Sequence, residues 1–143
     1  MSDELTKALQ LLPHGAEFRF IDRLLRLEEG RSAAAEYTVR GDESFLRGHF
    51  PGEPLVPGVL LIEAIAQLAG ITAQTDPTRA PMARLKLTAI RGAKIVGSAK
   101  PGERIHLEAN VTGRLGHLVQ ATGKATVDGA VVIQVELTLS GEI

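Results

Sequence analysis

Residues 48–74 read GHFPGEPLVPGVLLIEAIAQLAGITAQ, and this stretch decides the fold. Its first part is rich in Gly and Pro, which indicates a long loop of fixed conformation. From Pro57 onward almost every residue is apolar. Because proline is favoured in the first turn of a helix and Asp76-Pro77 breaks one, we predict a helix from residue 57 to about 74.

The predicted helix is apolar nearly all round, so we expect other structure to wrap it rather than to cover one face. Glu63 and Gln67 interrupt the apolar run. That interruption argues against a membrane span and for a buried helix of a soluble protein.

The rest of the chain carries mainly strand patterns. Ile105, Leu107, Ala109 and Val111 alternate with polar residues, and Asp128-Gly129 is a hairpin signal. We predict a short helix over 3–12 and strands over 18–28, 31–40, 83–96, 104–112, 117–127 and 130–140. One apolar helix among so many strands predicts an α+β fold in which an antiparallel β-sheet wraps around a central long α-helix. We expect a single domain spanning 1–143.

Composition excludes several classes of function. The formal net charge is −1 with no basic block, which gives no sign of nucleic-acid or anionic-membrane binding. The absence of Cys excludes disulfides, thiolate nucleophiles and Cys-ligated metals. The N-terminus lacks the basic-then-apolar order of a signal peptide, so we expect a cytoplasmic protein.

The candidate chemistry lies in a titratable pair. His49 sits in the Gly/Pro-rich loop, and Glu63 lies in the apolar helix, where a carboxylate is costly to bury. Gln67 shares a helix face with Glu63 and is placed to orient it. The backbone N–H groups of residues 58–60 open the helix, where they lack intrahelical partners and are candidates to polarise a carbonyl oxygen.

Plainer interpretations compete with this one. A loop histidine is usually structural, and a lone Glu on an apolar helix is sometimes paired with an Arg at a dimer interface. Gln67 is as well suited to filling a packing gap as to orienting a carboxylate. We expect His14, His106 and His117 to be structural or exposed.

The motif of residues 48–67 closely resembles the active-site region of bacterial (3R)-3-hydroxyacyl-acyl-carrier-protein dehydratases of the FabZ type. Leu11-Leu12-Pro13-His14 and Pro101-Gly102-Glu103 resemble further segments of that family. The resemblance implies a hot-dog fold and a homodimer with two active sites at its interface, which in several members assembles into a trimer of dimers. It implies no cofactor and no metal, because the substrate is carried on the phosphopantetheine of acyl carrier protein.

The resemblance also implies roles for particular residues. His49 of one subunit removes the C2 proton of a 3-hydroxyacyl thioester, while the Gly58 N–H, beside Val59, holds the thioester oxygen. Glu63 of the other subunit, kept protonated by its apolar setting, helps hydroxide leave as water, giving a trans-2-enoyl thioester.

The chain departs from the family pattern along the acyl tunnel, where we expect Phe50, Pro57 and Ile95. Ile95 stands where an aromatic residue is usual, and Tyr37 is the only tyrosine, so the family's tyrosine gate is missing. Two alternatives therefore stay open: a hot-dog acyl thioesterase, and a non-catalytic subunit that binds an acyl carrier.

Overall fold

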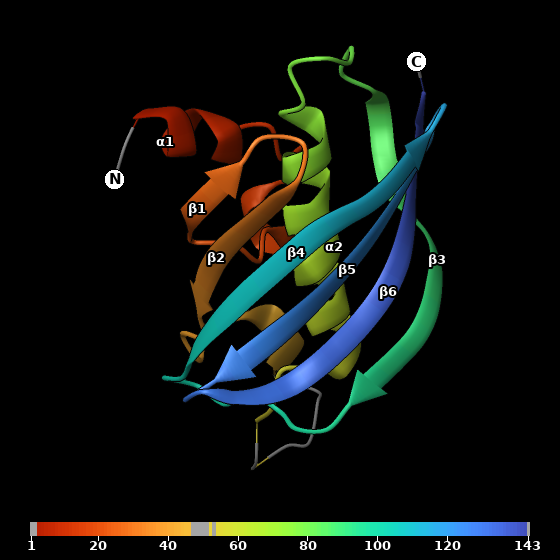
Figure 1. Cartoon of the computed structure of the whole chain (residues 1–143). Helices are drawn as coiled ribbons and strands as arrows, with labels where there is room; N and C mark the ends of the chain where they lie inside the picture. The colour runs from red at the N-terminus through yellow and green to blue at the C-terminus, as the bar shows by residue number, and fades with distance from the viewer. Residues whose placement is uncertain (1–2, 47–51, 53, 143) are drawn as a thin grey trace.

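A computed structural model describes residues 3–46, 52 and 54–142 of the chain. Its architecture is a six-stranded antiparallel sheet that curves around one long helix (Figure 1). The strands lie in the order β1-β2-β4-β5-β6-β3, so β1 and β3 form the two edges of the sheet. This is the hot-dog arrangement that the sequence predicts.

The elements follow the predicted order. They are α1 (Asp3–Leu9), a 3-10 turn η1 (Ala16–Phe18), β1 (Arg23–Glu28), β2 (Ser32–Thr38), a second 3-10 turn η2 (Ser44–Leu46), α2 (Gly58–Gln74), β3 (Ala83–Ile95), β4 (Arg104–Leu115), β5 (Leu118–Val127) and β6 (Ala130–Glu142). No helix within the described ranges combines the length and apolarity needed to cross a membrane.

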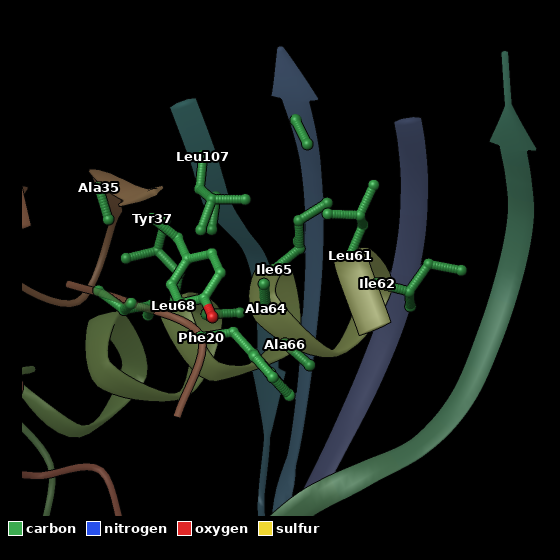
Figure 2. Close-up of a cluster of buried hydrophobic side chains, with 14 of the residues drawn as sticks. Phe20, Ala35, Tyr37, Leu61, Ile62, Ala64, Ile65, Ala66, Leu68 and Leu107 are labelled. Carbon is green, nitrogen blue, oxygen red and sulfur yellow. The ribbon is translucent and has the colours of Figure 1, made fainter. Parts of the chain in front are cut away.

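Helix α2 lies on the concave side of the sheet and forms the core with it (Figure 1). Leu61, Ile65 and Leu68 are almost fully buried, and Figure 2 shows them among side chains of the sheet such as Leu107 of β4. The alternating residues of β4 and β6 supply the inner face. The prediction of a helix wrapped by strands is therefore confirmed.

Three predicted boundaries are wrong by three residues or more. The strand predicted over 104–112 continues to Leu115. The first helix ends at Leu9 instead of residue 12, because the chain turns there ahead of Pro13. The strand predicted over 18–28 begins only at Arg23. Ahead of it, the backbone of Phe18 and Phe20 is hydrogen-bonded by the side-chain amide of Gln67, which takes the place of a neighbouring strand.

The edge strand β3 is the most exposed part of the sheet. It pairs only with β6 among the described strands, with irregular register at three points. Most of its residues are exposed, including Ile90 and Ile95. A long exposed edge with apolar side chains is a surface that proteins normally cover.

Gly123 of β5 marks the closest approach of helix and sheet. A Cβ atom there would collide with Ile65 of α2 and would lie 2.6 Å from the carbonyl oxygen of Glu108. We therefore expect Gly123→Ala to lower the free energy of unfolding by about 1–3 kcal/mol through overpacking, measured by urea denaturation. Gly15→Ala is the control, since its added Cβ meets nothing within 4 Å; equal midpoints for the two variants would contradict the prediction.

Candidate active site

Glu63 lies in the second turn of α2 and lines a pocket between the helix, β3, the segment after α1 and Leu139 of β6. Its side chain is 21% exposed, so it is half-buried instead of enclosed as the sequence suggests. The pocket has a volume of about 200 Å³. It is lined by Leu11, Leu12, Pro13, His14, Glu63, Ala66, Gln67, Gly70, Ile71, Gln74, Met82, Arg84, Leu85, Lys86, Leu87 and Leu139.

Among the described residues, two that carry N–H groups lie beside the Glu63 carboxylate. Gln67 Nε2 donates to Glu63 Oε2 at 3.2 Å, as the helix spacing predicts. His14 Nε2 lies 3.5 Å from the same oxygen. The carboxyl group is thus held in an orientation rather than left to rotate.

Gln67 is itself fixed and almost fully buried. Its Oε1 accepts a hydrogen bond from the Phe20 N–H at 2.9 Å, and its Nε2 also donates to the Phe18 carbonyl at 2.8 Å. A buried amide with its oxygen and nitrogen both satisfied has one orientation. Gln67 therefore links the Glu63 carboxylate to the segment ahead of β1.

Sequence reasoning missed His14, which it assigned to a structural or exposed role. The short helix α1 packs beside β1, and the chain then passes Pro13 into the pocket wall. The His14 ring stacks on Phe18, with 5.9 Å between ring centroids. Nothing in the local sequence signals the approach to Glu63, since only the fold brings these segments together. His117 is exposed as expected, and His106 is half-buried on β4.

The start of α2 lies apart from the Glu63 pocket. Glu63 is five positions beyond Gly58, which is about 7.5 Å along the helix axis. A Cβ on Gly58 would lie 2.9 Å from the end of the Ile95 side chain, so β3 comes close to the start of α2 at this point. Pro57, Val59 and Ile95 do not line the pocket, and the side chains of Val59 and Ile95 are mostly exposed.

Of the three N–H groups predicted to be available at the start of α2, those of residues 58–60, one is already used within the helix. The Leu60 N–H donates to the Pro57 carbonyl at 2.9 Å, because the first turn tightens. This leaves the Gly58 and Val59 N–H groups as the candidates. His49 and Phe50 lie outside the described residues.

A hydrogen-bond network fixes the chain ahead of the predicted catalytic loop. The Tyr37 hydroxyl donates to Glu43 Oε2 at 2.6 Å, and the Arg40 and Gly41 N–H groups also donate to that carboxylate. Burial and the bond to Glu43 raise the pKa of Tyr37 well above its usual value. Although burial opposes the effect, the hydrogen bonds from Tyr37 and the backbone lower the pKa of Glu43. The pair therefore stays a phenol and a carboxylate at neutral pH.

Another amide, that of Gln74, lines the pocket at the C-terminal end of α2. Gln74 Nε2 donates to the Met82 carbonyl at 2.6 Å, and the Met82 N–H donates to Gln74 Oε1 at 2.9 Å. Between this end and Glu63 the wall is largely apolar. Within the described ranges, no three His, Asp or Glu side chains gather as they would to hold a metal ion.

The fold and this pocket define a hot-dog protein of the FabA-like class. The FabA-like domain model matches residues 12–136. The 3-hydroxyacyl-[acyl-carrier-protein] dehydratase FabZ of Thiobacillus denitrificans is 36% identical over 136 residues, covering 94% of both chains. The FabZ of Bacillus subtilis is 36% identical over 132 residues, covering 92% of both chains. The chain therefore belongs to the FabA-like family, among its FabZ-type 3-hydroxyacyl-[acyl-carrier-protein] dehydratases.

Solved structures share the fold at low sequence identity. A chain of the dehydratase heterocomplex ApeI:P from Xenorhabdus doucetiae aligns with a TM-score of 0.78 at 18% identity, covering 97% of this chain and 91% of that one. Zebra fish thioesterase superfamily member 2 aligns with a TM-score of 0.69 at 18% identity, covering 94% and 91%. These two likenesses support the hot-dog architecture alone.

Proposed function

We propose that the chain dehydrates (3R)-3-hydroxyacyl thioesters of acyl carrier protein to trans-2-enoyl thioesters in acyl-chain biosynthesis. The observation that carries the proposal is the Glu63 carboxyl, held by Gln67 in the wall of a pocket whose other lining side chains are mainly apolar. The FabZ-type relatives support the same reaction. The reaction uses no bound cofactor, since acyl carrier protein supplies the thioester arm.

In the proposed mechanism Glu63 is the acid. As the C2–H bond breaks, its electron pair forms the C2=C3 double bond and the C3–O bond breaks. The departing hydroxide takes a proton from Glu63 and leaves as water. His49 takes the C2 proton, and the Gly58 N–H stabilises the charge on the thioester oxygen.

We place the acyl chain along the pocket, with C3 near Glu63. The apolar wall suits a hydrocarbon chain, and the Gln74–Met82 pair of hydrogen bonds limits how far the chain extends. Arg84 and Lys86 also line the pocket, which suits an acidic carrier protein approaching over β3.

A homodimer belongs to the same proposal. The exposed edge of β3 is free for a second copy to cover, and β3 also lines the Glu63 pocket. A partner seated there would bring its own residues close to Glu63, as the proposed roles of His49 and Glu63 require. Assembly into a trimer of dimers and the cytoplasmic location are parts of the proposal carried over from the sequence.

Turnover tests the proposal directly. The protein is incubated with (3R)-3-hydroxyacyl-carrier protein or the matching N-acetylcysteamine thioesters, and enoyl formation is followed by absorbance and mass spectrometry. Enoyl product that disappears in a His49→Ala control is the expected result. Release of free thiol without enoyl product indicates a thioesterase, and tight binding without any chemistry indicates a carrier-binding subunit; either result refutes the proposal.

Gly70 offers a test of the acyl path. It lines the pocket on α2, and an added Cβ meets Leu85 and Leu139 at 3.7 and 3.9 Å, which is ordinary contact. Gly70→Ala should raise the free energy of unfolding by about 0.5–1 kcal/mol, since glycine weakens a helix interior. It should also lower kcat/KM for long-chain thioesters relative to short ones by about tenfold, because the added methyl group takes up the space of one acyl carbon in the apolar part of the pocket.

The shortest thioester is the internal control for this variant. A stabilised protein with an unchanged chain-length profile would show that the acyl chain does not pass Gly70.

A further inference from the structure

The two contacts that the described residues make with the Glu63 carboxylate fall on one oxygen. Gln67 Nε2 and His14 Nε2 both approach Oε2, at 3.2 and 3.5 Å. A carboxyl oxygen that faces two N–H groups cannot also point an O–H toward them, because the hydrogens would collide. The two oxygens of Glu63 are therefore not equivalent.

His14 is held in place by its surroundings. Its ring stacks on Phe18, and its carbonyl oxygen accepts a hydrogen bond from Arg19 Nη2 at 3.4 Å. The side chain is 27% exposed, with Nε2 turned to Glu63. Its Nδ1 is buried and meets no hydrogen-bond partner among the described residues.

That environment selects one tautomer of the ring. A proton on Nδ1 would be a buried donor without an acceptor, which costs about 1–3 kcal/mol. A proton on Nε2 instead faces the Glu63 oxygen. The neutral ring with the proton on Nε2 is therefore favoured, and it presents an N–H to Oε2.

We propose that His14 is a positioning residue for the dehydration: with Gln67 it makes Oε2 the accepting oxygen and assigns the transferable proton to Oε1. The proposal rests on the proposed function and adds a residue to it. During the reaction the Oε1–H bond breaks, and the proton joins the hydroxide that leaves C3. The negative charge that remains on the carboxylate is then stabilised by the two N–H groups already aimed at Oε2.

The distance of 3.5 Å between His14 and Glu63 fits this role. It is long for a hydrogen bond, but such contacts tighten when substrate fills the site. The contribution is then larger in the transition state than in the ground state, so it appears in kcat more than in KM.

Three variants test the proposal on a shared thioester substrate. His14→Phe keeps a ring to stack on Phe18 and removes the donor, so kcat should fall by about tenfold or more with KM little changed. His14→Gln carries an N–H of similar reach and should restore part of the loss. In a Glu63→Gln background, His14→Phe should cause no further loss, since its effect passes through Glu63.

A tautomer measurement gives a readout independent of turnover. Histidine ring ¹⁵N shifts in the full-length protein report which tautomer the neutral ring adopts, and for His14 they should place the proton on Nε2; a neutral ring protonated on Nδ1 would overturn the assignment. If His14→Phe does not fold, His14→Leu serves as the second donor-free variant, with urea denaturation as the check on both.

The outcomes separate the two proposals. Absence of turnover in the unaltered protein refutes the proposed function. Normal turnover with a His14→Phe kcat within about twofold of the unaltered protein, smaller than a positioning role allows, refutes the role of His14 alone. An equal loss from His14→Phe with and without the Glu63 carboxyl marks a general structural effect and refutes it as well.

Discussion

Replacing Glu63 with Gln is expected to lower kcat by about 10²–10⁴-fold, because an amide cannot deliver the proton that the departing hydroxide needs. The substitution keeps the shape of the side chain, so the pocket and its apolar wall stay in place. Turnover of a (3R)-3-hydroxyacyl thioester, measured at high enzyme concentration, gives the magnitude.

Stability provides the check on this result. Glu63 is partly exposed and its contact with His14 is a long one, so its loss should change the free energy of unfolding by less than about 1 kcal/mol. Glu136→Gln, on the exposed side of β6, is the matched control and should keep full activity. A fully active Glu63→Gln variant would falsify the assignment of Glu63 as the acid.

Mixing two inactive variants is expected to restore activity. If His49 of one subunit works with Glu63 of the other, His49→Ala and Glu63→Gln homodimers each lack both sites. A hybrid dimer carries one site with both substitutions and one intact site. After unfolding and refolding together in equal amounts, turnover should return to about a quarter of the unaltered level, since half the dimers are hybrids with one site of two.

Refolding each variant alone is the control and should give no recovery. If the mixture stays as inactive as the separate variants, His49 and Glu63 do not combine across an interface. A monomer that is fully active by light scattering and assay would also contradict the shared site.

The sequence predicts the central helix well because its signals are local. The Pro just before it, the Asp-Pro just after it and the long apolar run all lie in α2 or within a few residues of its ends. Strands in which apolar and polar residues alternate, such as β4 and β6, are also predicted from local sequence. The segment 18–22 is misread because the amide of Gln67, distant in sequence, takes up its backbone hydrogen bonds.

The contacts of the candidate site also fall into two groups, those that follow from local spacing and those that only the fold creates. Glu63 and Gln67 share a helix face, so their contact follows from helical spacing alone. His14 joins them only after the chain folds, and its sequence neighbours Pro13 and Gly15 carry no sign of it. The half-buried state of Glu63 also depends on a pocket that four separate segments build.

The exposed edge of β3 makes a newly synthesised chain prone to aggregation before it dimerises. Until a second copy arrives, each folded subunit presents β3 as an edge that no other described strand covers, with apolar side chains such as Ile90 and Ile95 exposed. Such an edge attracts any other extended segment, so correct pairing competes with aggregation from the moment of synthesis. In the proposed assembly, the dimerisation that completes the active site also covers the β3 edge and so protects the protein from aggregation.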